Sequence, residues 1–280
     1  MNIVRNKTEL GRILDEKRKN GLTIGFVPTM GALHDGHISL IKNSISNCDF
    51  TVCSIFVNPT QFNDKADLER YPRMPEKDAQ MLEKAGCNLL FLPDVSEIYP
   101  EPDTRTFEFG ELDKVLEGKH RPGHFNGVAQ VVSKLFEIVK PHKAFFGIKD
   151  YQQLLIIKSL TNKLNIPTEI IPCEIMREPD GLAMSSRNML LSDTERKFAV
   201  NIPLVLKDAA QMLSSSIPLS KVKQMVSNKL SESILFKLDY FELCDADTLK
   251  PIDSLKKPGT SIILIACYVG KIRLIDNLVI

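Results

Sequence analysis

His34 and His37 are the side chains near the start of the chain that are best suited to chemistry. They lie at the end of the string P-T-M-G-A-L-H-D-G-H, which begins at Pro28 and leads from an apolar run into an amphipathic one. A helix that begins there offers unpaired backbone N–H groups and a partial positive charge, and the imidazoles add further donors. The pattern therefore predicts a receptor for a phosphate that gains negative charge during a reaction.

An H-x-x-H spacing also suits a metal site or a simple helix cap, so these alternatives stay open. Gly31 and Gly36 favour the phosphate interpretation, because glycines let a backbone approach a ligand closely. The two commonest phosphate motifs are excluded by the sequence. No two glycines stand two residues apart, which rules out G-x-G-x-x-G, and no G-x-x-x-x-G-K-[ST] occurs.

Two later clusters carry charges or hydroxyls. Lys149 and Asp150 lie between a predicted strand and a predicted helix, where a lysine can reach phosphate as a mobile point charge. Residues 184–187, Met-Ser-Ser-Arg, place two hydroxyls and a guanidinium on a loop suited to closing over a triphosphate. Each cluster also has a structural interpretation. Lys149 can be a solvated surface lysine, Asp150 can form a capping box with Gln153, and a Ser-Ser-Arg turn can be ordinary surface.

The elements that must position these residues alternate between strand and helix up to about residue 175. Strands are predicted at 22–28, 50–57, 88–92, 143–146 and 168–171, and helices after His37 and at 75–85, 127–139 and 150–164. Short apolar strands joined through helices favour right-handed crossovers and a mainly parallel sheet. Such a sheet binds ligands beyond the carboxyl ends of its strands, with helix N-termini facing anions.

The pattern changes near residue 176. A capping box at Ser192–Glu195 opens a helix, and a second helix is predicted at 219–235. Closely linked strands follow at 238–243, 261–269 and 272–275. The predicted fold class is therefore α/β, a Rossmann-like doubly wound parallel sheet with a smaller C-terminal α+β domain. The domains are predicted at 1–175 and 176–280, with residues 177–181 as the linker.

Composition narrows the classes of function. The 280 residues include 36 basic and 35 acidic side chains, and a net charge of +1 gives no strong field for nucleic acid. The longest apolar run, 262–269, is far shorter than the ~20 residues that a membrane-spanning helix needs. Glu9, Asp15 and Glu16 interrupt any signal-peptide core. The six cysteines form no C-x-x-C pair and lie among apolar neighbours. We therefore expect a cytoplasmic protein with reduced thiols that binds neither a membrane nor nucleic acid.

The motifs taken together resemble a known family. H-x-G-H after the first strand of an α/β domain is similar to the nucleotidyltransferase superfamily that includes class I aminoacyl-tRNA synthetases. The longer series is similar to the pantoate–β-alanine ligase family, and it covers about residues 24–190. The further matching segments are Phe56–Phe62, Tyr71–Arg73, Arg121–Val128, Phe145–Gln153 and Asp180–Asn188.

The resemblance implies an AMP-forming ligase. The carboxylate of (R)-pantoate attacks the α-phosphate of ATP to give pantoyl adenylate and pyrophosphate, and the amine of β-alanine then displaces AMP to form pantothenate. Residues 1–175 would bind ATP and pantoate, and residues 176–280 would form a lid that carries the Met-Ser-Ser-Arg loop. The implied partners also include a second copy of the chain in a homodimer, and the implied cofactor is Mg²⁺, which accompanies ATP.

The resemblance also implies roles for individual residues. The catalytic group comprises His37, matched to a proton donor, with His34, Lys149, Ser185 and Arg187. The ATP site comprises Met30, Gly31, Ala32, Leu33, His34, Asp35, Gly36, His37, Gly147, Ile148, Lys149, Asp150, Met176, Met184, Ser185, Ser186 and Arg187. Gln61, Gln153 and Asn58 would bind pantoate, with Gln61 also near β-alanine and Met30 a further candidate for that pocket.

Four positions are less directly matched. Asp78 corresponds to a position near the family's magnesium site, although alone it is one acidic residue on a predicted surface helix. His124 lies in a matching segment without an assigned role. Position 35 is Asp where Glu is usual, and Ile148 stands where an acidic residue is common, which alters the charge beside the phosphates.

Three other functions remain as alternatives. The first is a nucleotidyltransferase that moves AMP onto a phosphate monoester. The second is a non-catalytic nucleotide-binding protein, against which the intact set His34, His37, Lys149 and Arg187 argues. The third is an H-x-x-H metal hydrolase that acts without ATP.

Overall fold

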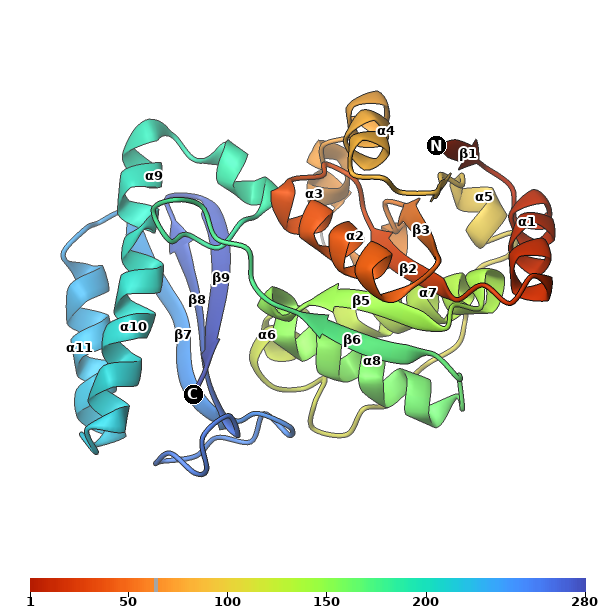
Figure 1. Ribbon diagram of the computed structural model, residues 1–280. Helices are drawn as coiled ribbons and strands as arrows, with labels where there is room; N and C mark the ends of the chain where they lie inside the picture. Colours follow the sequence, from red (N-terminus) through yellow and green to blue (C-terminus); the bar gives the residue numbers. More distant parts are fainter. Residues whose placement is uncertain (63–64) are drawn as a thin grey trace. The chain divides into compact units, whose positions relative to one another are not determined.

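The computed structural model describes residues 1–62 and 65–280, and the chain forms two compact units (Figure 1). The first unit comprises Met1–Ile148 and Gln152–Glu174, and the second comprises Lys149–Tyr151 and Ile175–Ile280. Apart from Lys149–Tyr151, the boundary between the two units therefore lies between Glu174 and Ile175.

The first unit is built on a six-stranded sheet in the order β1-β4-β3-β2-β5-β6, in which every neighbouring pair is parallel. Its strands are β1 (Asn2–Val4), β2 (Ile24–Thr29), β3 (Phe50–Ile55), β4 (Leu89–Phe91), β5 (Lys143–Gly147) and β6 (Glu169–Cys173). Helices lie on both faces of the sheet (Figure 1). The predicted α/β doubly wound class is confirmed.

Alternating side chains on the strands divide the core of this unit into two layers. Phe26 and Val52 pack against α1 (Lys7–Lys19), α7 (His124–Val139) and α8 (Tyr151–Lys163). Val27 and Cys53, the next residues along the same strands, pack with α2 (Asp35–Asn47) and α4 (Pro75–Lys84). Successive side chains of a strand point to opposite faces, so burial of both faces explains why these strands read as continuous apolar runs.

Shorter elements complete the first unit. They are η1 (Pro59–Gln61), α3 (Lys65–Arg70), α5 (Val95–Ile98), α6 (Leu116–His120) and η2 (Ile148–Asp150). The sequence prediction omitted β1 and α1, and it began α7 at Gly127, three residues too late. Gly123, with φ +81°, takes the left-handed conformation just before the true start of α7.

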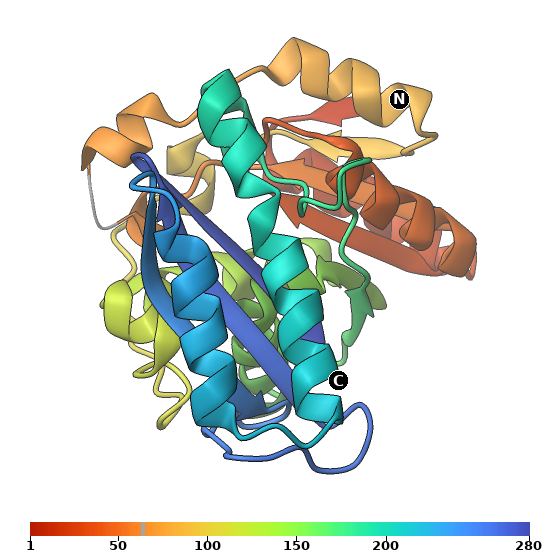
Figure 2. The same ribbon diagram turned by 90° about the vertical axis from the view of Figure 1, so that its left-hand side faces the viewer.

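The second unit has a three-stranded antiparallel sheet in the order β7-β8-β9. The strands are β7 (Phe236–Asp245), β8 (Ser261–Val269) and β9 (Ile272–Val279), and the helices are η3 (Ser186–Leu190), α9 (Asp193–Ala199), α10 (Asn201–Ser214) and α11 (Leu219–Ser231). Helices α10 and α11 cover one face of this sheet (Figure 2). The predicted capping box is confirmed, because Ser192 and Glu195 bond reciprocally at the start of α9. The last strand is four residues longer than predicted.

Residues 177–181 belong to the second unit, and the prediction that they form a linker was wrong. Arg177 pairs with Ala183 in an antiparallel bridge, and its guanidinium binds the buried Asp276 at 2.7 Å. Arg196 binds both Glu178 and Asp180 at 2.6 Å. These ion pairs fix the turn to β9 and α9, so its Pro and Gly mark a tight turn and not a flexible connection.

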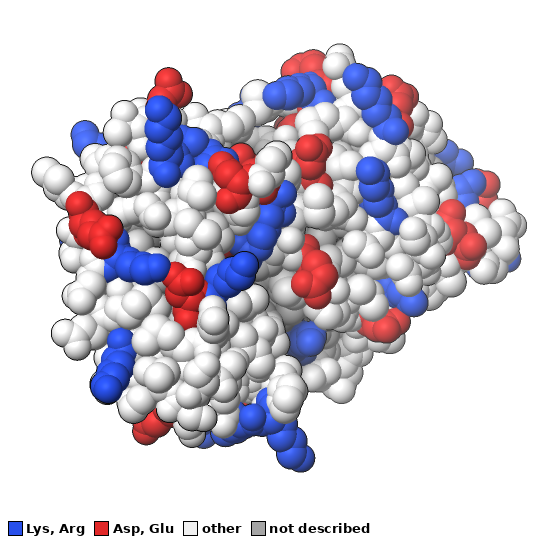
Figure 3. Space-filling view, turned by 60° about the vertical axis from the view of Figure 1, so that its left-hand side comes forward, with Lys and Arg blue, Asp and Glu red and all other residues white. Residues whose placement is uncertain are grey.

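Acidic and basic side chains are interspersed on the face drawn in Figure 3, as the near-zero net charge suggests. Within the described ranges, every helix is too short or too polar to cross a bilayer. All six cysteines are free thiols, and five of them are buried.

Candidate active site

His34 and His37 meet at the start of α2, in the loop that follows β2. His34 is the N-cap, and its Nδ1 accepts the backbone N–H of Gly36 at 3.1 Å. His37 Nδ1 accepts the backbone N–H of His34 at 3.3 Å, and the two ring centroids are 4.1 Å apart. A ring nitrogen that accepts a hydrogen bond carries no proton, so each neutral ring has its proton on Nε2. The capping box thus turns both imidazoles into Nε2–H donors.

A buried carboxylate fixes the loop in front of the histidines. Asp78, on α4, is 1% exposed, and its Oδ2 accepts the N–H of Ala32 at 2.9 Å while its Oδ1 accepts that of Leu33 at 2.8 Å. Gly31 has φ +83°, and a Cβ there would lie 3.1 Å from Asp78 Oδ2. Ala32 has φ +51°, a strained value for a residue with a side chain. The two hydrogen bonds hold this conformation in place.

The prediction that placed Asp78 on an exposed helix surface was wrong. Each of its oxygens accepts one backbone N–H, so Asp78 fixes the loop that contains Ala32 and Leu33. In the part of the chain that the structure describes, no three His, Cys, Asp or Glu side chains form a set that could hold a metal ion. Magnesium that accompanies ATP needs only one or two protein carboxylates, so the place of Asp78 near such a site stays a prediction.

Gln61 lies at the end of η1 beside Met30. It is 9% exposed, and its Nε2 is 2.8 Å from the sulfur of Met30. Its Oε1 accepts a hydrogen bond from Asn58 Nδ2 at 3.1 Å. The structure thus brings together three residues that were predicted for the pantoate pocket.

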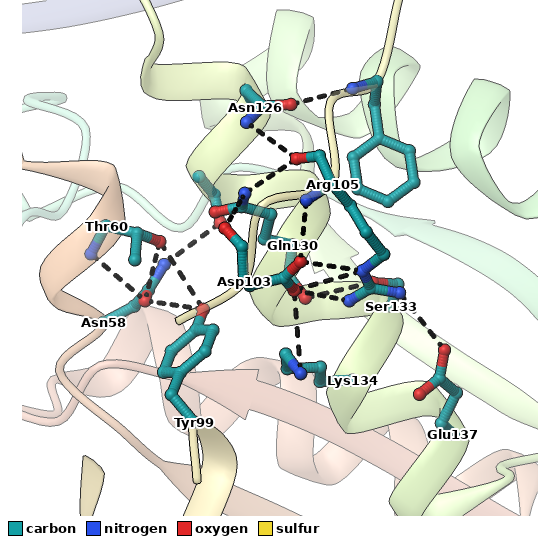
Figure 4. Close-up of polar contacts among 12 residues, drawn as sticks. Asn58, Thr60, Tyr99, Asp103, Arg105, Asn126, Gln130, Ser133, Lys134 and Glu137 are labelled. Atoms are coloured by element: carbon teal, nitrogen blue, oxygen red, sulfur yellow. Dashed lines mark hydrogen bonds and ion pairs between the residues drawn. The ribbon is translucent and has the colours of Figure 1, made fainter. Parts of the chain in front are cut away.

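Asn58 holds Gln61 through a hydrogen bond, and its own predicted contact with pantoate stays a prediction. It is 1% exposed, and its Nδ2 also donates to the carbonyl of Gly127 at 3.1 Å. Its Oδ1 accepts from the N–H and the hydroxyl of Thr60 and from the hydroxyl of Tyr99 (Figure 4). Both ends of the amide are therefore committed to protein groups.

Helix α7 presses directly against η1. A Cβ on Gly127 would lie 2.4 Å from the carbonyl oxygen of Thr60, so only glycine fits at this position. His124, at the start of α7, has Nδ1 2.9 Å from the carbonyl oxygen of Gln61 and Nε2 3.1 Å from the guanidinium of Arg121. A guanidinium can only donate, so Nε2 accepts and Nδ1–H donates to Gln61. His124, which had no predicted role, thereby holds the backbone of Gln61.

Gln153 is half-buried on α8, but the neighbouring Gln152 carries the visible hydrogen bonds. Gln152 Nε2 donates to the carbonyls of Leu112 and Val115, and its Oε1 accepts the N–H of Glu117 at 3.0 Å. These bonds tie α8 to α6 and to the segment before it. Gln152 and Gln153 are adjacent amides in the sequence. No local pattern indicated that Gln152 makes these structural hydrogen bonds, and the predicted contact of Gln153 with pantoate stays a prediction.

The remaining predicted residues that carry hydroxyl or cationic groups belong to the second unit. Lys149 Nζ is 3.8 Å from Asp150, and the carbonyl of Lys149 accepts a hydrogen bond from Asn277 on β9 at 2.9 Å. Met184 donates its N–H to the carbonyl of Met176 at 2.9 Å, which places two predicted ATP contacts side by side.

Ser185 caps η3, and its Oγ accepts the N–H of Arg187 at 3.2 Å. The hydroxyl proton of Ser185 therefore remains able to donate to another group. Of the predicted loop at residues 184–187, Met184 and Ser185 are irregular and Ser186 and Arg187 begin η3, and its closing motion stays a prediction. Gly147 and Ile148 belong to the first unit.

Comparison with known proteins decides among the alternatives. The family described as Pantoate-beta-alanine ligase matches residues 2–279. The chain belongs to this family. The predicted resemblance, ligase activity and fold are therefore confirmed.

Individual relatives of this family match along nearly their whole length. The pantothenate synthetase of Porphyromonas gingivalis (strain W83) is 49% identical over 278 residues, which are 99% of each chain. The crystal structure of pantothenate synthetase from Thermus thermophilus has a TM-score of 0.93 at 39% identity and covers 99% of both chains. A Francisella tularensis pantoate–β-alanine ligase, complexed with β-γ ATP and β-alanine, has a TM-score of 0.83 at 39% identity, covering 100% of this chain and 97% of that one.

Proposed function

We propose that this enzyme condenses (R)-pantoate with β-alanine to pantothenate at the expense of ATP, through a pantoyl adenylate. The family match and the relative complexed with β-γ ATP and β-alanine support this reaction. The observation that carries the mechanism is the reciprocal capping of His34 and His37, which leaves both rings with the proton on Nε2.

In the first half-reaction, the pantoate carboxylate attacks the α-phosphate and pyrophosphate leaves. Negative charge grows on the phosphoryl oxygens, and fixed N–H donors stabilise it without reorganising. The Nε2–H groups of His34 and His37 are those donors, and His37 transfers its proton to the departing pyrophosphate. Their positions are set by the backbone of the loop and by Asp78 beneath it.

Gln61 binds the pantoate carboxylate and hydroxyls, and Gln153 assists it. Asn58 holds Gln61 Oε1, so Nε2 of Gln61 is the end available as a donor to the substrate. In the second half-reaction, the β-alanine amine attacks the acyl carbon beside Gln61, the C–O bond to AMP breaks, and the amine proton is lost. Holding both substrates in place supplies most of the acceleration.

The phosphates also require cationic and hydroxyl groups from Lys149, Ser185, Ser186 and Arg187. Lysine acts as a point charge, and the guanidinium can bind two oxygens at once. Gly147, Ile148, Asp150, Met176 and Met184 are the further proposed ATP contacts. Mg²⁺ enters as the chelate of ATP, and no residue is assigned to hold it. The enzyme is proposed to act as a homodimer in the cytoplasm.

Product analysis tests the proposal. Purified protein is mixed with Mg-ATP and pantoate, with and without β-alanine, and pyrophosphate and AMP are followed separately. Without β-alanine we expect one burst of pyrophosphate, about equal to the enzyme concentration, and no free AMP. With β-alanine, AMP and pantothenate accumulate together. Steady AMP release without β-alanine, or transfer of AMP to a phosphate monoester, contradicts the proposal. A reaction without pantoate is the control.

A further inference from the structure

Tyr99 contacts the amide that orients Gln61, although no sequence pattern drew attention to it. It follows α5, and its hydroxyl donates to Asn58 Oδ1 at 2.9 Å (Figure 4). The same hydroxyl is 3.5 Å from Thr60 Oγ1. Tyr99 is thus linked to Gln61 through Asn58. Its link to a bound substrate would run through both Asn58 and Gln61.

The ring of Tyr99 is held independently of its hydroxyl. Its centroid lies 6.1 Å from that of Phe56, and Lys134 Nζ lies 5.4 Å over its face. Lys134 is itself 3.6 Å from the carboxylate of Asp103. Burial of the ring raises the pKa of Tyr99, so the hydroxyl keeps its proton and remains a donor. Removing the oxygen alone therefore leaves the packing of the ring in place.

The direction of the Asn58 amide determines which end of Gln61 faces outward. The carbonyl of Gly127 must accept, so it fixes the Nδ2 end of Asn58, and the Thr60 N–H must donate, so it fixes the Oδ1 end. The contact with Thr60 N–H is long, at 3.4 Å, whereas that with Tyr99 is 2.9 Å. Tyr99 therefore gives Asn58 Oδ1 its shortest hydrogen bond and stabilises the amide in the direction that the Gly127 carbonyl and the Thr60 N–H select.

We propose that Tyr99 is a positioning residue for substrate recognition, because its hydroxyl stabilises the orientation of Asn58 that leaves the donor end of the Gln61 amide facing outward. This inference rests on the proposed role of Gln61 in binding pantoate. When Asn58 loses this donor its amide rotates more freely, and Gln61 presents oxygen as well as nitrogen to a carboxylate. The pantoate carboxylate is repelled by the amide oxygen of Gln61. We therefore expect the substitution to weaken the binding of pantoate and not that of ATP.

Tyr99→Phe tests the inference. The KM for pantoate is expected to rise about 3- to 10-fold, the scale of one lost hydrogen bond, with the KM for ATP and kcat within about twofold of wild type. Tyr268→Phe is the matched control, because Tyr268 on β8 also has a lysine, Lys237, over its ring at 5.9 Å. An unchanged pantoate KM in Tyr99→Phe, or an equal rise in the KM for ATP, overturns the inference.

A double-mutant cycle separates positioning from a general loss of structure. In a Gln61→Ala background, Tyr99→Phe is expected to leave the pantoate KM unchanged, because the group it orients has been removed. Additive effects of the two substitutions overturn the inference, as does a Gln61→Ala variant with a normal pantoate KM. In either case the wild-type enzyme still makes pantothenate, so these failures are distinct from failure of the proposed reaction.

Discussion

Oδ1 of Asp78 lies 2.8 Å from the backbone nitrogen of Leu33, and the two residues are 45 positions apart in the chain. Helix α4 thereby supports the loop that presents the histidines at the start of α2. The carboxylate fixes the backbone of the proposed phosphate site, and the place near magnesium that the family resemblance implies for it stays a prediction.

Asp78→Asn is expected to lower the free energy of unfolding by about 1–3 kcal/mol, because an amide NH₂ would face a backbone N–H that now has no acceptor. The KM for ATP should rise as the loop loosens. Urea unfolding and steady-state kinetics measure the two effects. If the carboxylate acts only on the loop, the Mg²⁺ concentration for half-maximal rate should not change, and a large shift in it at normal stability would support the cation-binding role.

His37→Ala is expected to reduce adenylate formation by about 10²-fold or more, the cost of losing one donor to a developing charge. Pyrophosphate release in a single turnover measures this step. His142→Ala is the control, since His142 Nδ1 also accepts a backbone N–H, that of Ile24, at 2.8 Å. That variant should lose stability but retain the rate per folded molecule, and unchanged turnover in His37→Ala would refute the assigned role.

Gly127→Ala should separate α7 from η1, because the added Cβ would lie 2.4 Å from a backbone oxygen that cannot move alone. We expect a loss of about 1–3 kcal/mol in unfolding free energy and a higher KM for pantoate. Gly11→Ala on α1 is the matched control. A Cβ there meets nothing within 4 Å, so that variant should be neutral or more stable by up to about 1 kcal/mol. Equal behaviour of the two variants would contradict the predicted crowding.

Acid should weaken the second unit through Asp245. Hydrogen bonds from Lys256 and Thr248 lower the pKa of this carboxyl from 3.8 to about 2. A lowered pKa in the folded state means that the stabilisation is present above about pH 4 and is lost as the pH falls toward 2. The difference in thermal midpoint between wild type and Asp245→Asn should therefore shrink over that interval. A difference independent of pH would show that the carboxylate contributes no charge-dependent stability.

The sequence predicted those parts of the fold that local pattern encodes. Strand β8 was predicted with its observed bounds because its apolar run is long and uninterrupted. Helix α1 was missed because its sequence is rich in charge, and only Leu10 and Leu14 of its residues are buried. Strand β1 has only three residues and exists through its pairing with β4, a partner more than 80 positions away.

The candidate site also contains features that local sequence pattern indicates and features that depend on contacts between distant segments. The pairing of His34 with His37 follows from their spacing and from the helix that begins between them, so the sequence could indicate it. The burial of Asp78 and Asn58 depends on segments that meet only in the folded chain, and their residue types gave no hint of it. Gly127 did carry a signal, because a glycine inside a predicted helix often marks a close approach of two backbones.

The direct contact between α7 and η1 makes the proposed pantoate pocket sensitive to residues far from it. Phe136, near the other end of α7, packs edge-on against Phe26 and Phe146 in the core. A helix moves as a rod, so repacking around Phe136 changes where Gly127 sits and, with it, where Gln61 points. Libraries designed to accept bulkier or smaller acids in place of pantoate should therefore vary the buried side of α7 as well as the pocket itself.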